Sequence, residues 1–140
     1  MDKKLRIASV MLYVYSAVTL LFGFIYSFTS TIMPYHVKFL GMAQEQLKPE
    51  VAALFLTSYK VIGACFLSLG VVVVMLVKGP FSKGDRWTWW TILVTGLIVL
   101  VPLLFITLKV GLSSPWWVVS ILIIILIVAM AISWKPTSSK

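Results

Sequence analysis

Acidic side chains are scarce in this chain of 140 residues, which has four of them against twelve lysines and arginines. The four carboxylates are Asp2, Glu45, Glu50 and Asp85, and all lie outside the long apolar runs or at their edges. Proton-coupled export of cationic drugs depends on an acid inside the membrane, and general acid–base catalysis depends on positioned proton donors and acceptors. The sequence therefore argues against a drug exporter of that kind and makes an enzyme the weaker interpretation.

Cysteine and histidine each occur once, as Cys65 and His36. A lone cysteine cannot form an internal disulfide, and thiol–disulfide chemistry needs paired cysteines. A haem with two histidine ligands or a zinc site needs more ligands than these two residues supply. No phosphate-binding loop, dinucleotide fingerprint or nucleophile elbow is present. We therefore expect no cofactor, no metal site and no catalytic residue that the sequence can identify.

Apolar residues, by contrast, make up 61% of the chain, and charged residues only 11%. Soluble domains are about half apolar and a quarter charged, and a membrane-spanning helix needs about 20 mostly apolar residues. Four segments meet that requirement, at about residues 7–29, 51–77, 87–108 and 115–134. Runs such as VVVVMLV do not alternate, which favours helices over barrel strands.

The sequence thus predicts an all-α fold: an integral membrane four-transmembrane-helix bundle that forms a single membrane domain over residues 1–140. The first helix is expected to be retained, because its apolar run is longer than that of a usual signal peptide. The longest connection, residues 30–50, forms the outer loop. A short amphipathic helix is expected within it, around Leu40, Ala43 and Leu47.

Basic residues predict the orientation of this bundle, since lysine and arginine collect on the cytoplasmic side. They precede the first span, fill the connection between the second and third, and follow the fourth: Lys3, Lys4, Arg6, Lys78, Lys83, Arg86, Lys135 and Lys140. Both termini are therefore predicted in the cytoplasm. The net charge of +8 is largely this topology signal, so no nucleic-acid partner is expected. The expected partners are membrane lipids, and a homo-oligomer or a larger membrane complex is possible.

Small and hydroxylated residues share one face in three of the predicted spans. The first has Ser9, Tyr13, Ser16, Gly23 and Ser27, the second Ala53, Thr57, Lys60, Ala64 and Ser68, and the third Thr88, Thr95, Pro102 and Lys109. Because small residues allow helices to pack closely in lipid, we expect these three faces to meet. The alternative is that they line a cavity. The fourth span, rich in isoleucine and valine, is expected on the outside of the bundle.

Lys60 interrupts the second apolar run. Counting back from Lys78 at about 1.5 Å per residue places Lys60 about 27 Å away, near the outer boundary of the membrane. If the span instead began at Val51, the charge would lie about 13 Å deep and cost about 2–3 kcal/mol. The second helix is too long for one straight span, which favours the shallower position and an anchoring role.

Five residues are expected near the outer face: Lys60, Lys109, His36, Tyr35 and Tyr59. They suggest a pocket for a hydrophobic or anionic amphipathic ligand, such as a lipid, a fatty acid or a quinone-like molecule. An accessory membrane subunit fits the same sequence. A small oligomeric transporter of an anionic solute and a lipid- or quinone-modifying enzyme are the alternatives.

Two motifs, MPYHVKFLG in the outer loop and YKVIGACFLSLG in the second span, resemble those of the DoxX-like group of small four-helix bacterial membrane proteins. The resemblance covers about the first half of the chain. It implies a four-helix bundle in the bacterial inner (plasma) membrane, crossed several times, and some members are associated with quinone-linked oxidoreductases. That group has arginine or glutamate where this chain has Lys60, so no role is carried over to that lysine.

Overall fold

The computed structural model describes residues 2–138, and within this range the chain is helical with no strand. Its four long helices are α1 (Lys3–Phe28), α3 (Pro49–Lys78), α4 (Arg86–Val110) and α5 (Trp116–Ser138). All four are long and apolar enough to cross a membrane, which confirms the predicted number of spans and indicates a multi-pass membrane protein. The short helix α2 (Pro34–Leu40) and two 3-10 turns lie in the connections.

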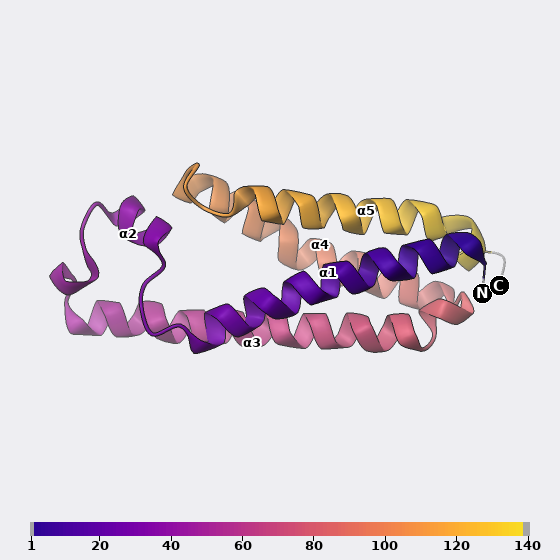
Figure 1. Cartoon of the computed structure of the whole chain (residues 1–140), viewed down its shortest axis with the longest axis horizontal. Helices are drawn as coiled ribbons and strands as arrows, with labels where there is room; N and C mark the ends of the chain where they lie inside the picture. Colours follow the sequence, from indigo (N-terminus) through magenta and orange to yellow (C-terminus); the bar gives the residue numbers. More distant parts are fainter. Residues whose placement is uncertain (1, 139–140) are drawn as a thin grey trace.

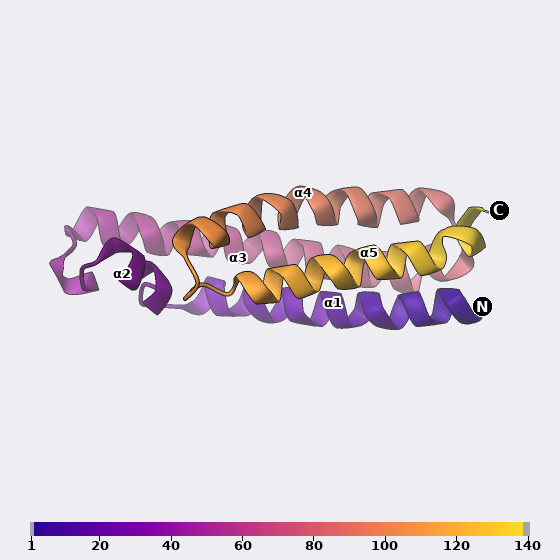
Figure 2. The ribbon, with the colours of Figure 1, turned by 90° about the horizontal axis from the view of Figure 1, so that it is seen from above.

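The four long helices run side by side in an up-and-down bundle (Figure 1). One end, which we call the basic end, holds the beginning of α1, the α3–α4 connection and the end of α5 (Figures 1 and 2). The other, the α2 end, holds the connections that follow α1 and α4. The two ends of the described chain therefore lie together.

Local sequence explains where the helices begin and end. The Asp2 side chain caps α1 by accepting a hydrogen bond of 2.7 Å from the Lys4 backbone N–H, so α1 begins before the predicted residue 7. Pro34 opens α2, and Gly41, with a φ of 68°, ends it. The short helix thus precedes the segment around Leu40 to Leu47, and its predicted position was wrong. Pro49 opens α3 as expected.

The order of packing differs from the expected one. Helix α1 packs along both α3 and α5, and α5 also packs along α4, whereas α3 and α4 touch very little. The predicted outside position of the fourth span was therefore wrong. Its Leu122, Leu126 and Ala129 are buried, while Ile121, Ile124 and Ile127 are exposed. Lipid is as apolar as these side chains, so hydrophobicity does not distinguish the two faces of such a helix.

The polar stripe of α3 faces outward and not, as the sequence had predicted it would, toward the other helices. Thr57, Lys60, Ala64 and Ser68 are all exposed, so the expectation that this stripe meets other helices was wrong. The face that packs against α1 contains Gly63 instead. A Cβ atom there would lie 2.6 Å from the Ser27 backbone nitrogen, so only glycine permits this approach. The α1 stripe is buried in part, at Ser9, Ser16 and Gly23, with Tyr13 exposed.

At the basic end, Arg86 joins the first turn of α4 to the last turns of α5. Its guanidinium carbon lies 3.5 Å from the centre of the Trp134 ring, and Nη1 donates hydrogen bonds to the Trp134 carbonyl and the Thr137 hydroxyl at 3.1 and 3.2 Å. Trp89 adds a hydrogen bond of 2.9 Å from Nε1 to the Met130 carbonyl. Together with the hydrogen bonds, this cation–π contact stabilises the packing of α4 against α5.

Candidate ligand site at the α2 end

The α2 end of the bundle is built on the unusual length of α3. This helix has 30 residues, and at about 1.5 Å per residue it is about 45 Å long, longer than a bilayer core is thick. Its first turns extend beyond the other three long helices, as Figures 1 and 2 show. The connection from Thr29 to Lys48, with α2 in it, folds over these turns. Helix α2 also contacts α4, so this connection covers part of the end of the bundle.

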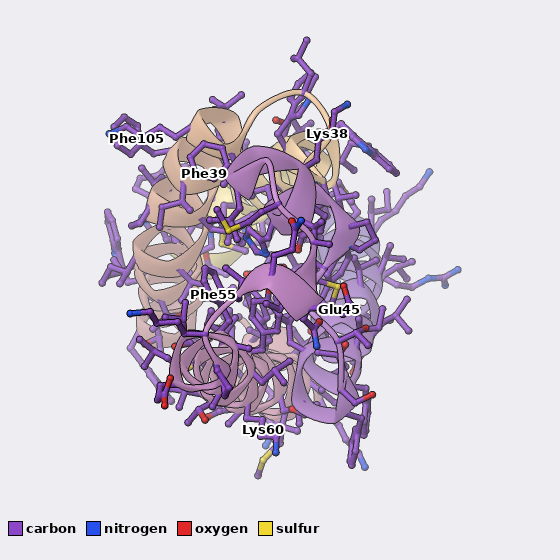
Figure 3. All side chains as sticks on the ribbon, turned by 90° about the vertical axis from the view of Figure 1, so that its left-hand side faces the viewer. Lys38, Phe39, Glu45, Phe55, Lys60 and Phe105 are labelled. Atoms are coloured by element: carbon purple, nitrogen blue, oxygen red, sulfur yellow. The ribbon has the colours of Figure 1, made fainter. Side chains whose placement is uncertain are left out.

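Six rings gather where this cover meets α1 and α3, and we call them the aromatic cluster: Tyr26, Tyr35, His36, Phe55, Tyr59 and Phe66. The His36 and Tyr59 rings are stacked with their centres 5.5 Å apart. Tyr26 meets Tyr59 edge to face at 5.4 Å and Phe66 at 6.1 Å. Figure 3 looks onto this end, with Phe55 near the middle of the view.

Hydrogen bonds connect the polar atoms of the cluster. The Tyr26 and Tyr35 hydroxyls bond to each other. The Tyr59 hydroxyl accepts the backbone N–H of Met33 at 3.4 Å and bonds to Nδ1 of His36. Because that hydroxyl already accepts from Met33, its own proton is free to go to His36. The Tyr59 hydroxyl thereby ties α3 to both ends of the Met33–His36 turn.

This network bears on the protonation state of His36. When the Tyr59 hydroxyl donates to Nδ1, the ring proton of the neutral imidazole lies on Nε2; in the other tautomer Nδ1 donates to the same hydroxyl. Burial lowers the pKa of His36 below its usual value, which favours the neutral form at pH 7. Burial and the adjoining Tyr26 hydroxyl raise the pKa of Tyr35, which therefore stays protonated. Across residues 2–138 no group bonds to Nε2, so the Nε2–H of the first tautomer can donate to a ligand.

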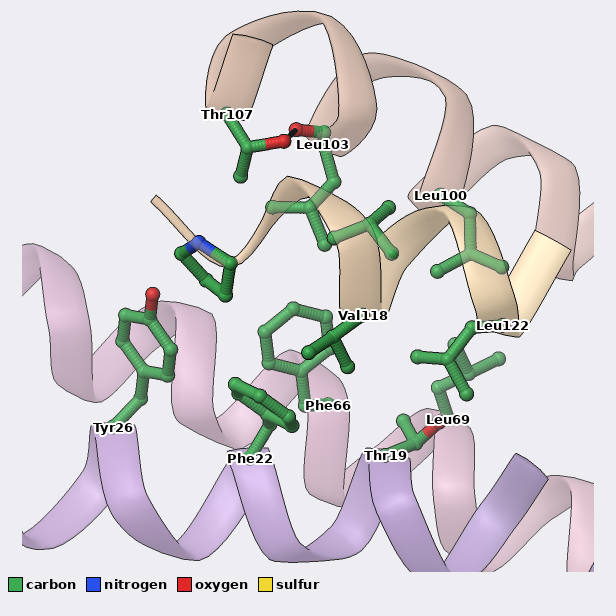
Figure 4. A pocket seen from close by; sticks show the side chains of 12 residues that line it. Thr19, Phe22, Tyr26, Phe66, Leu69, Leu100, Leu103, Thr107, Val118 and Leu122 are labelled. Atoms are coloured by element: carbon green, nitrogen blue, oxygen red, sulfur yellow. Dashed lines mark hydrogen bonds between the residues drawn. The ribbon is translucent and has the colours of Figure 1, made fainter. Parts of the chain in front are cut away.

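A narrow apolar cavity begins at the aromatic cluster and continues between the four long helices (Figure 4). Its volume is about 30 Å³, so the passage between the helices is narrow. Tyr26 and Phe66 form walls of this cavity as well as parts of the cluster. The remaining lining comes from all four helices and the turn before α5: Thr19, Phe22, Leu69, Leu100, Leu103, Thr107, Pro115, Val118, Val119 and Leu122.

The polar groups of the cavity wall are few and mostly engaged. Thr107 donates to the Leu103 carbonyl at 2.9 Å, and Thr19 donates to the Tyr15 carbonyl at 2.8 Å. From Tyr26 toward the basic end, the wall of the cavity is thus almost wholly apolar. A narrow apolar cavity with polar groups at one end suits an amphipathic molecule with a slender chain.

A second hollow lies beside the cluster on the surface of α3. It is lined by His36 together with Leu54, Phe55, Ser58, Tyr59 and Ile62, and its volume is about 260 Å³. It is the more open of the two hollows. His36 is therefore reachable from outside the bundle. Tyr59 lines this hollow and contacts the ring of Tyr26, which lines the narrow cavity.

Three of the five residues expected near the outer face come together, namely His36, Tyr35 and Tyr59. The two lysines do not join them. Lys60 is exposed and points away from the bundle (Figure 3), and the exposed Lys109 lies with Nζ 4.5 Å from the centre of the Phe105 ring. Phe105 and Lys60 lie on different sides of the molecule in that view. Ligand binding by any of the five stays a prediction.

Sequence reasoning missed the other half of the site. Tyr26 and Phe66 connect the cluster to the cavity, yet each is a single aromatic residue in an apolar run and carries no recognisable pattern. The cavity combines residues of four helices, so its prediction needed the order of packing. Among residues 2–138 no group of three metal-ligating side chains occurs, and the cluster has no carboxylate beside His36 to form an acid–base pair.

Comparisons of the chain with protein-family models, curated proteins and solved structures found no match. The resemblance to the DoxX-like group therefore stays an expectation. Function has to be argued from the site itself.

Proposed function

We propose that this is a protein of the bacterial inner (plasma) membrane, with both termini in the cytoplasm and the α2 end on the outer side. The support is the distribution of charge, because seven lysines and arginines of the described chain belong to the basic end: Lys3, Lys4, Arg6, Lys78, Lys83, Arg86 and Lys135. Lys38 and Lys48 in the α2-end connection are balanced by Glu45 and Glu50. This asymmetry is the positive-inside pattern.

In that membrane, the protein binds an amphipathic lipid whose head is uncharged and bears oxygen, and whose chain lies in the cavity. One observation supports this most directly: Tyr26 and Phe66 belong both to the hydrogen-bonded cluster and to the wall of the apolar cavity. A polar site and an apolar slot are therefore continuous. The narrow slot favours a single chain over a ring system.

The charge of the head follows from the cluster. His36 is neutral at pH 7 with Nε2 open to a ligand, and the tyrosine hydroxyls can donate or accept. An anionic head would need a cation within reach, and the cluster contains none, since Lys38, Lys60 and Lys109 are all exposed. The cluster thus favours a hydroxyl, ester or carbonyl oxygen over a carboxylate or phosphate.

The test compares a monoacylglycerol with the fatty acid of equal chain length, which has a carboxylate in place of the uncharged glycerol ester. A ligand that binds only the folded protein raises its melting temperature. We expect the monoacylglycerol to raise the melting temperature of the detergent-purified protein at pH 7.5 more than the fatty acid does. The variants His36→Phe and Leu103→Trp should lose this rise, because one removes a donor and the other fills the cavity.

Matched variants test the location. Lys60→Ala removes an exposed lysine, and Val101→Trp adds the same ring to an exposed position of α4. Both should respond to the monoacylglycerol as the unmodified protein does. The proposal fails if neither probe raises the melting temperature, or if the fatty acid is the better ligand and Lys60→Ala abolishes its effect.

A further inference from the structure

The middle of α1 contains a tyrosine whose hydroxyl lacks a partner. Tyr15 is fully buried, at 0% exposure. Within residues 2–138 its hydroxyl is the buried side-chain oxygen that makes no hydrogen bond. Thr19, one turn along α1, is the polar side chain nearest to this hydroxyl, but its own hydroxyl donates to the Tyr15 backbone carbonyl at 2.8 Å. A phenylalanine would supply the same ring without burying an unpaired hydroxyl, so packing alone does not account for tyrosine here.

This hydroxyl lies just below the inner end of the cavity. The cavity wall includes Thr19 on α1, Leu100 on α4 and Leu122 on α5. Tyr15, Gly96 and Leu126 are each one helical turn nearer the basic end on the same three helices. They also meet in space, because a Cβ atom on Gly96 would lie 2.6 Å from Cδ2 of Leu126 and 3.4 Å from the Tyr15 hydroxyl oxygen.

Because Gly96 has no side chain, the Tyr15 hydroxyl and the Leu126 side chain have room beside it. The Leu126 side chain lies beside Gly96, as the Tyr15 hydroxyl does, and it ends in two methyl groups that can change rotamer. A polar atom at the tip of a ligand chain can reach the hydroxyl by displacing those methyl groups. Such an atom would supply the hydrogen bond that Tyr15 lacks.

We propose that Tyr15 donates a hydrogen bond to an oxygen atom at the inner end of the ligand chain. This inference rests on the proposed function and narrows the ligand to a lipid with oxygen at both ends of its apolar part. The helical rise places the backbones of Tyr15 and Tyr26 about 16 Å apart along α1. Tyr15 is then a specificity-determining residue for an oxygenated chain.

The experiment compares two monoacylglycerols of equal chain length, one with a plain chain and one with a keto group at the far end. Affinity is measured with the unmodified protein, with Tyr15→Phe, and with Tyr13→Phe as the matched control. Tyr13 is an exposed tyrosine of the same helix. We expect the unmodified protein and Tyr13→Phe to bind the keto probe about three- to tenfold more tightly, as one neutral hydrogen bond predicts.

Tyr15→Phe should bind both probes equally while melting at the same or a higher temperature than the unmodified protein, because it buries no unpaired hydroxyl. Equal affinity of the unmodified protein for the two probes would mean that a water molecule, and not the ligand, bonds to the Tyr15 hydroxyl. That result would overturn this inference, while the proposed function would stand. Binding of neither probe would overturn both.

Discussion

At the scale of single residues, the proposed ligand site depends on the contact between His36 and Tyr59. Their hydrogen bond engages Nδ1 of the imidazole and leaves Nε2 open to a ligand. The stacked rings and the Met33 N–H keep this geometry without any charged neighbour in the cluster. A protonated His36 could not accept from Tyr59, so the network depends on pH.

Acidification is therefore expected to weaken the packing of α2. Burial lowers the pKa of His36 in the folded protein below the value of about 6.5 that it has in an unfolded chain. The unfolded chain then binds the proton more readily, so stability is fully present above about pH 6.5 and falls as the pH drops through the folded pKa. The melting temperature of the unmodified protein should fall more between pH 7.5 and 5.5 than that of His36→Gln.

Glutamine is the suitable control because it keeps a donor and an acceptor but does not titrate. The other titratable side chains of the cluster are Tyr26, Tyr35 and Tyr59, and the adjacent Lys38 on α2 is exposed. A tyrosine does not change charge between pH 5.5 and 7.5. An equal fall in both proteins would show that His36 is not the responsible group.

At the scale of elements, the α1–α3 pair is the most closely packed, and glycines make it so. Gly23 on α1 and Gly63 on α3 are buried, and each has the partner helix against it. A Cβ atom on Gly63 would lie 2.6 Å from the Ser27 nitrogen and 2.8 Å from the Gly23 carbonyl oxygen. These are backbone atoms, which cannot rotate away.

We therefore expect Gly63→Ala to destabilise the bundle. Overpacking of this kind costs about 1–3 kcal/mol, and here it opposes the better helix propensity of alanine, about 1 kcal/mol. Because the obstacle is backbone, the net effect should be a loss. The measurement is the free energy of unfolding in mixed micelles with increasing SDS.

Ser68→Thr is the matched control, since it also adds one methyl group to α3 but on the exposed face. Its free energy of unfolding should stay within about 0.5 kcal/mol of the unmodified protein. If the two variants were equally stable, the close approach of α1 and α3 at Gly63 would be wrong.

The same pair of helices shows what sequence could and could not predict. The length of the apolar runs predicted four helices, and Pro49 predicted the start of α3. The face of α3 was predicted wrongly, because Ala64 and Ser68 suit a helix contact as well as Gly63 and Gly70 do. In lipid the outward face is not marked by polarity, so the pattern that orients a soluble helix is missing.

At the scale of the whole molecule, the uneven helix lengths create the site. Helix α3 exceeds the others at the α2 end, and the polar cluster forms on its overhanging turns beside the mouth of the bundle (Figures 1 and 2). Tyr35, His36 and Tyr59 were predicted as site residues because they lie near that end in sequence. The cavity was not, since α5 was expected outside the bundle and contributes Val118, Val119 and Leu122 to the wall.

The side of the membrane from which the proposed ligand binds depends on the orientation of the bundle. Cysteine labelling tests this orientation directly. In a Cys65→Ser background, which removes the single cysteine, Lys38→Cys and Lys78→Cys introduce exposed thiols at opposite ends of the bundle. The positive-inside pattern predicts that a membrane-impermeant maleimide added to spheroplasts labels Lys38→Cys and spares Lys78→Cys. Both should be labelled once the membrane is dissolved in detergent, and Cys65→Ser alone should not react. Labelling of Lys78→Cys but not Lys38→Cys in intact spheroplasts would reverse the topology and place the aromatic cluster on the cytoplasmic side, where its ligand would have to be supplied from the inner leaflet.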